Sequence, residues 1–431
     1  MLHIYILHVT FLVLILHRFD RRSSSLCFLL PLLCASYLVA GEESSGAIYN
    51  VINFGAVGNG RTDDTKSFLR AWDLACRDRT SPMTTFLVPS GKTFLLNQIK
   101  FNGSCHSSHI HFNVLGNLVA PNRRWKVSHT ANWITFRDVR GLRIDGGGII
   151  DGRGSRWWDC VKKKECINAP YGVGIFACKN FRMSGLHFRN SPGKHLSLHA
   201  VSGAFINGIT VDSPESSPNT DGMHIKESHN IIVNGSSFST GDDCISIGNG
   251  SQDIDITHVK CGPGHGISIG SLGNGDEMIH VQRIHVSHCS FVKTTNGARI
   301  KTWEGGYGFA KGIIFEQLTF ESVVHPILID QHYCTGLICP RKEPIKKSAV
   351  HVSDIHFIGL TGTSSSHAPI TLNCSRIIPC TNIQLKDVNI KGAFGIKTQH
   401  SVCGHAHIKQ RGTIVPPITC LRPPTISSPY A

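Results

Sequence analysis

Short segments with the apolar alternation of β-strands recur along most of this chain, and this repetition constrains its fold more than any other feature. The segments start at intervals of about 22–35 residues, with Asn, Gly, Ser and Asp filling the gaps. They span residues 142–150, 181–188, 206–211, 231–238, 254–259, 279–291, 313–320, 350–357 and 383–390. Such a period is typical of a solenoid, in which each unit lacks a core of its own and stacks on its neighbours.

No comparable run of helices alternates with these strands, which argues against a leucine-rich or α/β architecture. We predict an all-β fold, a single-stranded parallel β-helix that occupies one domain over residues 45–425. A pair of β-sandwiches is the alternative. Residues 49–56 are expected to form a short strand that runs into a glycine-rich turn.

A short amino-terminal helix is expected after Thr62 or Asp63, either of which can cap it. Its apolar positions at helical spacing are Phe68, Leu69, Trp72 and Ala75. We expect its apolar face to cover the open end of the stack, where unpaired strand edges would otherwise invite aggregation.

Residues 1–40 are interpreted as a signal peptide or an atypical hydrophobic extension. Arg18, Arg21 and Arg22 precede a short apolar run, and small residues lead to an expected cleavage near Ala40. Neither apolar run reaches the ~18–20 residues of a membrane-spanning helix. We therefore expect a secreted, extracellular protein with no stable membrane association after cleavage.

Cysteine usage agrees with an oxidising compartment, because most of the sixteen cysteines form near pairs in the sequence. The expected disulfides are Cys76–Cys105, Cys160–Cys166, Cys244–Cys261, Cys334–Cys339, Cys374–Cys380 and Cys403–Cys420. Cys27 and Cys34 lie in the expected signal, and Cys178 and Cys289 are left over as buried thiols. The alternative, zinc binding, lacks its tight Cys-x-x-Cys spacing here. Sequons typical of a secreted glycoprotein stand at Asn102, Asn234, Asn249 and Asn373.

The formal net charge is +14, and no long Lys/Arg block concentrates it. A diffuse positive field favours polyanionic partners, which leaves nucleic acid, acidic lipid and acidic polysaccharide open. With 41 % hydrophobic and 17 % charged residues, the chain is too apolar to be disordered.

Four polar segments interrupt the repeats, at residues 217–222, 241–248, 262–270 and 299–301. From Asp221 to Asp242 the gap is 21 residues, from Asp242 to His265 it is 23, and from His265 to Arg299 it is 34. Residues one turn apart in a solenoid stack ~4.8 Å apart across parallel strands. The four segments are therefore expected to converge on one face.

Asp221, Asp242 and Asp243 would repel one another in one place, which raises the pKa of at least one of them. A protonated acid beside ionised bases is what glycoside hydrolysis requires. Arg299 and Lys301, two apart on a strand, would point the same way and hold a carboxylated sugar. Two alternatives remain: turn aspartates of purely structural value, and a calcium ligand set.

The four polar segments resemble the signature of the polygalacturonases, the family-28 glycoside hydrolases, and all four are complete in this chain. Plant-like stretches accompany them at residues 49–76, 299–303, 330–334 and 420–421. The resemblance implies a right-handed, pectin-lyase-like parallel β-helix that hydrolyses α-1,4-linked galacturonan with inversion. It also implies polyanionic pectin (polygalacturonate) as the partner and the cell wall as the location.

The resemblance also implies catalytic roles. Asp242 is expected to be the general acid, and Asp221 and Asp243 are expected to activate water on the opposite face. His265 is expected to tune the protonation of the acid.

For substrate binding, the resemblance implies that Arg299 and Lys301 hold the galacturonate carboxylate and that Asn219 orients its neighbours. The family also has a functional tyrosine after the Arg/Lys pair, and Tyr333 is the candidate that the sequence offers without settling it.

Three alternatives stay open. They are a rhamnogalacturonan or xylogalacturonan hydrolase on the same fold, a calcium-dependent pectate lyase, and a non-catalytic wall-binding protein. We expect no cofactor, no metal and no nucleic-acid partner. We expect the protein to be a monomer. The sequence does not decide between endo and exo attack.

Overall fold

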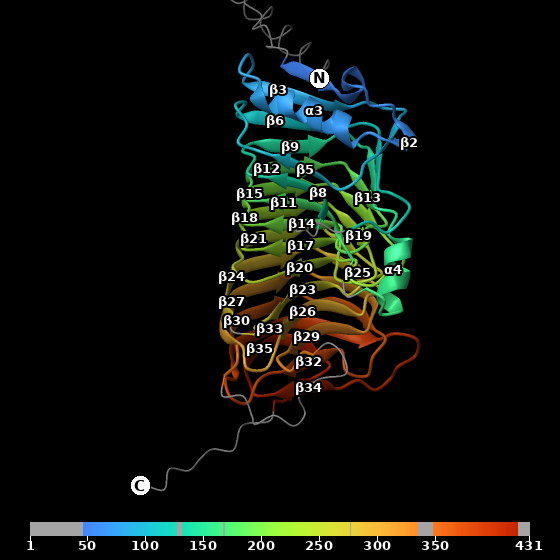
Figure 1. The fold of residues 1–431 in the computed structure, drawn as a ribbon. Coiled ribbons are helices and arrows are strands. Elements are labelled where there is room, and N and C mark those ends of the chain that lie inside the picture. Colours follow the sequence, from blue (N-terminus) through green and yellow to red (C-terminus); the bar gives the residue numbers. More distant parts are fainter. Residues whose placement is uncertain (1–45, 127–131, 167–168, 276, 335–347, 421–431) are drawn as a thin grey trace, which may run out of the picture. The chain divides into compact units, whose positions relative to one another are not determined.

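The computed structural model describes residues 46–126, 132–166, 169–275, 277–334 and 348–420. Their strands form a 24-stranded and an 11-stranded sheet, and all of the named strand pairs are parallel (Figure 1). Each strand pairs with the equivalent strand one turn later, so that the chain passes through three strand columns per turn. This architecture confirms the predicted parallel β-helix. The expected signal at residues 1–40 lies outside the described residues.

The 11-stranded sheet forms one face. It consists of β5 (Ile99–Asn102), β8 (Asn132–Arg137), β11 (Tyr171–Phe176), β14 (Leu196–His199), β17 (Met223–Lys226), β20 (Ile245–Ile247), β23 (Ile267–Leu272), β26 (Asn296–Thr302), β29 (His325–Asp330), β32 (Ile370–Asn373) and β34 (Ser401–Gly404).

The 24-stranded sheet supplies the other two columns. The column of longer strands consists of β1 (Ala47–Asn50), β3 (Met83–Val88), β6 (His109–Val114), β9 (Leu142–Asp145), β12 (Lys179–Ser184), β15 (Ser202–Asn207), β18 (His229–Asn234), β21 (Gln252–Thr257), β24 (Met278–Ser287), β27 (Tyr307–Glu316), β30 (His351–Ile358), β33 (Cys380–Gly392) and β35 (Ala406–Val415).

The column of shorter strands also joins β33. It consists of β2 (Asn59–Asp63), β4 (Thr93–Leu95), β7 (Asn117–Val119), β10 (Ile149–Asp151), β13 (His187–Arg189), β16 (Thr210–Asp212), β19 (Ser237–Ser239), β22 (Lys260–Cys261), β25 (Ser290–Val292), β28 (Thr319–Val323) and β31 (Thr361–Ser364).

Aliphatic side chains in register fill the interior behind the 11-stranded sheet. Leu198, Ile225, Ile247, Ile269 and Ile300 occupy equivalent positions on five successive turns, and each is fully buried. Burying one such side chain contributes ~1.5–3 kcal/mol. This ladder fixes the strand register, because a slip of one residue would turn every one of these side chains to the outside.

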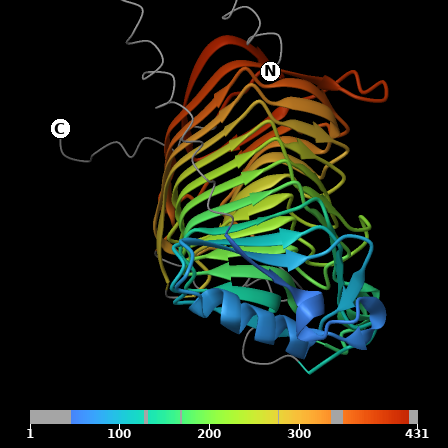
Figure 2. The same ribbon diagram turned by 90° about the horizontal axis from the view of Figure 1, so that it is seen from above.

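Helix α3 (Thr65–Arg77) covers the amino-terminal end of the stack, as the sequence predicts (Figures 1 and 2). Phe68 packs against Phe86, with ring centroids 5.7 Å apart, and Trp72 packs against Phe101 at 5.1 Å. The expectation for Leu69 is wrong, because this side chain is 40 % exposed.

The cap of α3 also differs from the expectation. Asp64 precedes the helix, and its carboxylate accepts hydrogen bonds from the amides of Val57 and Gly58 rather than from the helix. Asp63 accepts instead from the Thr65 amide, at 3.0 Å. Both predicted cap residues, Thr62 and Asp63, lie in strand β2, and the residue at the cap position is Asp64.

Two further elements depart from the sequence-based expectation. After β1, Val51–Phe54 form a 3-10 helix (η2), where a strand leading to a turn was predicted. Helix α4 (Ser155–Lys162) was not predicted, and it buries Trp157 and Trp158 on one side. Among the described residues, no helix is long and apolar enough to cross a membrane.

Disulfides join the turns of the stack at both ends and at the middle. Cysteine pairs within bonding distance are Cys76–Cys105, Cys160–Cys166, Cys244–Cys261, Cys374–Cys380 and Cys403–Cys420. Cys178 and Cys289 are buried free thiols. The expected partner of Cys334, Cys339, lies outside the described residues.

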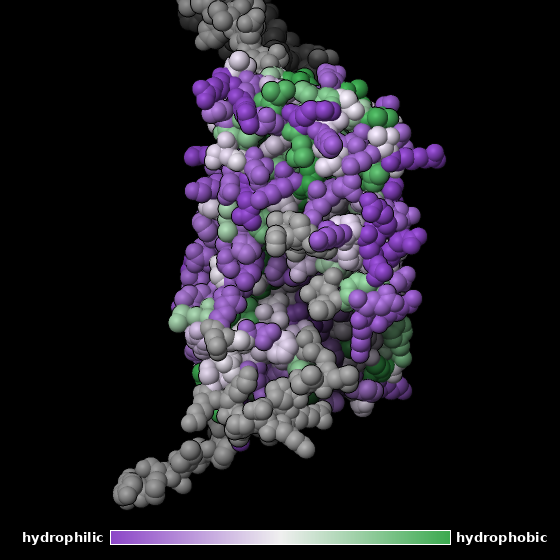
Figure 3. Space-filling model, in the orientation of Figure 1, coloured by the Kyte–Doolittle hydropathy of each residue, from purple (hydrophilic) through white to green (hydrophobic). Residues whose placement is uncertain are grey.

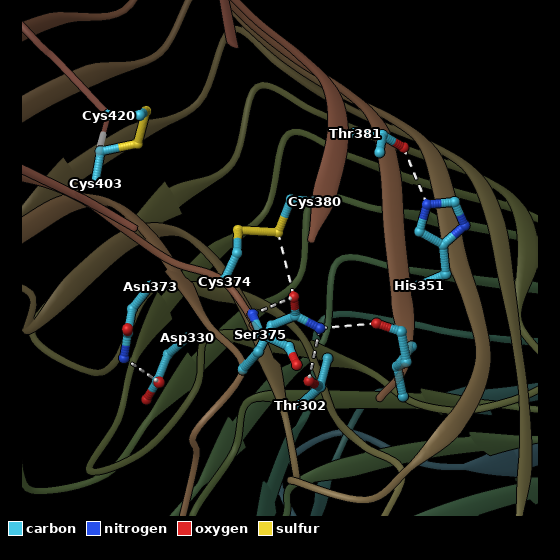
Figure 4. Close-up of a disulfide and its surroundings, with 12 residues drawn as sticks. Thr302, Asp330, His351, Asn373, Cys374, Ser375, Cys380, Thr381, Cys403 and Cys420 are labelled. Carbon is cyan, nitrogen blue, oxygen red and sulfur yellow. Dashed lines mark hydrogen bonds between the residues drawn. A yellow bond between two sulfur atoms is a disulfide. The ribbon is translucent and has the colours of Figure 1, made fainter. Parts of the chain in front are cut away.

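Gln331 connects the carboxyl-terminal turns beside the Cys374–Cys380 disulfide, because its amide oxygen lies 3.2 Å from Cys380 Sγ. Figure 4 shows this disulfide with Ser375 and Thr302 nearby. Its amide nitrogen donates to the Val350 carbonyl at 2.7 Å, and its amide oxygen accepts from the Ser375 amide at 3.0 Å. This side chain is 1 % exposed, so its hydrogen bonds satisfy a polar group that would be costly to bury alone.

Candidate active site

A ladder of polar side chains stands on the outer face of the 11-stranded sheet. Ser197, His224, Ser246, Ser268 and Arg299 occupy equivalent positions on successive strands, each one residue before a member of the buried aliphatic ladder. Strand alternation therefore turns these side chains outward. The ladder forms the floor on which the acidic residues rest.

The turns that lead into β17 and β20 deliver the carboxylates to this floor. Asp221 lies just before β17, and Asp242 and Asp243 lie just before β20. Ser246 donates a hydrogen bond to Asp221 at 2.7 Å, and Ser268 donates one to Asp243 at 2.8 Å. The predicted convergence of the polar segments is therefore visible in these contacts.

Asp243 is buried against two cations. Lys301 Nζ lies 2.8 Å from its Oδ2, and the Arg299 guanidinium contacts Oδ1. Burial by itself would raise the pKa of Asp243, but the charges of Arg299 and Lys301 and the hydrogen bonds from Lys301 and Ser268 outweigh it and lower this pKa. Asp243 is thus held as an ionised carboxylate.

Asp221 has the opposite electrostatic environment. Burial raises its pKa to about 7, Lys194 opposes the rise, and the charges of Asp242 and Asp243 add to it. The resemblance assigned the protonated acid to Asp242, whereas the raised pKa falls on Asp221. The physical reason is depth, because the Asp221 side chain is only 9 % exposed.

His224 completes the hydrogen bonds below Asp221. Burial lowers its pKa well below the usual value, so the imidazole is neutral. Its Nδ1 lies 2.7 Å from Ser246 Oγ, and Ser246 donates its proton to Asp221. Nδ1 is therefore the donor in the chain from His224 through Ser246 to Asp221.

His265 contacts Asp242 directly. Its Nδ1 lies 3.0 Å from Asp242 Oδ1, and the same oxygen accepts a hydrogen bond from the Asp243 amide at 2.8 Å. The imidazole is 40 % exposed, so it reaches solvent at the rim. This geometry allows proton exchange between the Asp242 carboxyl and water through His265.

A cavity of about 300 Å³ opens above these groups. Asp221, Asp242 and Asp243 all line it, as does Asn219, whose φ of 56° is one that asparagine tolerates well. Lys301 lines the wall, but Arg299 does not, because its guanidinium is turned to Asp243 and Ser268.

Two tyrosines and a second lysine, Lys194, also line the cavity. The sequence offered Tyr333 as a candidate for the family's tyrosine without settling it, and it assigned no role to Tyr171 or Lys194. Tyr333 stands 5.2 Å from Lys301 Nζ, measured to its ring centre, and Tyr171 stands 5.4 Å from Lys194 Nζ. Lys194 lies in the turn before β14, outside all four polar segments, and no sequence signal distinguished it. Ser246 and Ser268 could have been found from the sequence, because each stands in an Ile-Ser-Ile-Gly repeat, at residues 245–248 and 267–270.

Asp242, Asp243 and His265 can each offer a ligand atom within 4.8 Å of the others. Calcium takes six to eight oxygen ligands, and a histidine nitrogen suits it poorly. Both oxygens of Asp243 already contact Arg299 or Lys301, whose positive charges oppose a bound cation. The residues present therefore do not fit the calcium site of a lyase.

Paired carboxylates of opposite pKa tendency in a cleft of a parallel β-helix define a glycoside hydrolase site. Residues 76–411 match the model of the glycosyl hydrolases family 28. A probable polygalacturonase of Arabidopsis thaliana is 41 % identical over 380 residues, which cover 88 % of this chain and 81 % of that protein. The chain belongs to glycosyl hydrolases family 28.

Other relatives agree with this assignment. A polygalacturonase of Persea americana is 40 % identical over 371 residues, covering 84 % of this chain and 78 % of that protein. The solved polygalacturonase of Erwinia carotovora shares the fold at a TM-score of 0.66 and 22 % identity, over 84 % of this chain and 97 % of that one. The solved endo-xylogalacturonan hydrolase of Aspergillus tubingensis shares the fold at a TM-score of 0.71 and 22 % identity, over 87 % of this chain and 99 % of that one.

Proposed function

We propose that this protein hydrolyses the α-1,4-galacturonosidic bonds of polygalacturonan, with inversion, in the extracellular space or the cell wall. The observation that carries the proposal is one cavity in which three carboxylates stand between cations. Family membership and the disulfides support the substrate class and the oxidising location.

The order of the groups follows the order of the strands. Lys194 precedes β14, Asp221 precedes β17, Asp242 precedes β20, His265 precedes β23, and Lys301 lies in β26, which are consecutive strands of the sheet. Cations therefore stand on both sides of the acids along the stack. A polymer with one carboxylate per sugar matches this arrangement, because sugars on both sides of the reacting bond meet a positive charge.

In the proposed reaction, the Asp242 carboxyl gives its proton to the glycosidic oxygen as the bond from that oxygen to the anomeric carbon breaks. A water molecule attacks this carbon from the opposite face and loses a proton to the carboxylate pair of Asp221 and Asp243. His265 returns a proton to Asp242 from solvent. The low pKa of Asp243 keeps one member of the pair ionised throughout.

Incubation of the purified protein with polygalacturonic acid tests this proposal. Hydrolysis produces reducing ends without the ultraviolet absorbance of the unsaturated sugar that a lyase releases, and a calcium chelator leaves the rate unchanged. Proton NMR of the first product should show the inverted anomer. A rate that disappears with chelator, or the appearance of unsaturated product, would overturn the proposal in favour of a lyase.

A further inference from the structure

A second hollow, of about 840 Å³, lies on the column of longer strands over β6, β9, β12 and β15. Figure 3 shows hydrophilic side chains gathered at the upper left of the view, where β6, β12 and β15 are labelled in Figure 1. Arg140, Arg143 and Arg182 line this hollow, which we call the arginine groove. The catalytic cavity lies on the other sheet.

The three arginines of the arginine groove and the adjacent Lys179 form two facing pairs on neighbouring turns. Arg143 stands in register with Arg182, and Arg140 forms a β-bridge with Lys179. Like charges directly opposite each other across strands destabilise a sheet. Four exposed cations on two turns that are ~4.8 Å apart therefore concentrate positive charge without a structural benefit.

Acidic side chains neutralise only part of this charge. Asp145 contacts both Arg143 and His111, each at 2.5 Å. Among the residues that the structure describes, Arg140, Lys179 and Arg182 have no ion-pair partner. Their charges remain available to an anion from solution.

The shape of the groove favours an extended ligand over a small ion. His111, Arg143, Arg182 and Phe205 stand in register on four successive turns, so the cations follow the stack axis and lead to an apolar side chain that is 39 % exposed. A carboxylated sugar chain presents anions at regular intervals and ring faces between them, which matches both features. Guanidinium groups bind carboxylates through paired hydrogen bonds.

We propose that the arginine groove is a non-catalytic binding site for polygalacturonate, which holds the enzyme on the polymer while the cavity on the other sheet cleaves. The proposal rests on the proposed function for the identity of the polymer. Occupation of both sites by one polymer network raises the effective concentration of cleavable bonds at the cavity.

Surface plasmon resonance on immobilised polygalacturonic acid tests the proposal, with Asp242→Asn in every protein so that the surface is not degraded. Arg140→Gln/Arg182→Gln is the test variant. The matched control is Lys409→Gln/Arg411→Gln, which removes the same charge from exposed positions of β35 in the same sheet. We expect a roughly tenfold rise in the apparent Kd for the test variant, and no more than a twofold rise for the control.

A second measurement uses the same two double variants with Asp242 intact. Hydrolysis of trigalacturonate, which is too short to reach both sites, should equal that of the unchanged protein in both variants. Hydrolysis of the polymer at low concentration should fall in the test variant and not in the control. Equal loss of binding in test and control variants, or full binding in the test variant, would overturn the second site. Slow trigalacturonate hydrolysis in the test variant alone would do so as well, whereas failure of every protein, the unchanged one included, to hydrolyse trigalacturonate would count against the proposed function instead.

Discussion

The ammonium group of Lys194 lies 3.9 Å from the carboxylate of Asp221, at the end of the cavity away from Lys301. It is the largest influence that opposes the burial of Asp221, whose pKa is nevertheless raised to about 7. The charges of Asp242 and Asp243 and the hydroxyl of Ser246 also act on this carboxylate. The protonation state of Asp221 therefore depends on the charge of Lys194 as well as on burial and on the two neighbouring carboxylates.

Lys194→Met should raise the pKa of Asp221, because it removes the nearby positive charge. If Asp221 acts as part of the base, the acidic limb of the pH–kcat/KM profile moves to higher pH. The exposed Lys260→Met, on another face, is the matched control and should leave the profile unchanged. Movement of the alkaline limb instead would assign Asp221 the role of the acid.

Asp221→Asn should stabilise the folded protein at neutral and alkaline pH. The folded pKa of about 7 exceeds the ordinary value of 3.8, so the unchanged protein loses stability as pH rises between these values. The asparagine variant lacks this loss, and its melting temperature should exceed that of the unchanged protein at pH 8 but not at pH 4. Equal melting curves at both pH values would contradict the raised pKa.

Asp243→Asn should have the opposite effect. The folded pKa of Asp243 is lowered, so its stabilisation is present above the ordinary value of 3.8 and is lost as pH falls through the folded pKa. The variant leaves Arg299 and Lys301 buried without their anion, which typically costs about 3–5 kcal/mol. Urea unfolding at pH 7 measures this loss, which should shrink at low pH.

Asp242→Asn should lower kcat by about 10²–10⁴-fold, because the amide preserves the shape of the carboxyl but cannot act as an acid. The circular dichroism spectrum and the binding of oligogalacturonate should be retained. Turnover near that of the unchanged protein would remove Asp242 from the acid role and leave Asp221, with its raised pKa, as the candidate.

Arg299→Gln should weaken catalysis as well as binding. The guanidinium contacts Asp243 and donates to Ser268 at 2.8 Å, so its loss raises the pKa of Asp243 and loosens the floor of the site. We expect kcat to fall, and KM for polygalacturonate to rise by a smaller factor, because Arg299 does not line the cavity and acts on the substrate only through Asp243 and Ser268. Arg283→Gln, in an exposed pair with Asp253, is the control and should leave both constants near their original values.

The sequence alone could predict the parallel β-helix and the meeting of Asp221, Asp242 and Asp243, because both follow from strand period and from spacing of about one turn. It could not predict the deviations at chain ends and turns. Leu69 is at helical spacing yet exposed, because the helix axis determines which positions face the stack. Lys194 was missed because a single lysine in a turn has no pattern, and only the fold brings it to Asp221.

The sequence also could not predict which carboxylates of the site are ionised and which has a raised pKa. Repulsion among three carboxylates predicts that one pKa rises, but not which one. That depends on the depth of Asp221 and on the positions of Arg299 and Lys301 beside Asp243, both of which are properties of the packed structure.

Each turn of the stack from β14 to β26 contributes at least one residue to the wall of the cavity, in chain order. Duplication of a whole turn would therefore lengthen the row by ~4.8 Å while leaving the aliphatic ladder continuous. In most enzymes an insertion of more than twenty residues through the active site would abolish the fold. In this architecture such an insertion only lengthens the binding cleft. The number of sugars bound can therefore evolve separately from the residues that hydrolyse the bond between them.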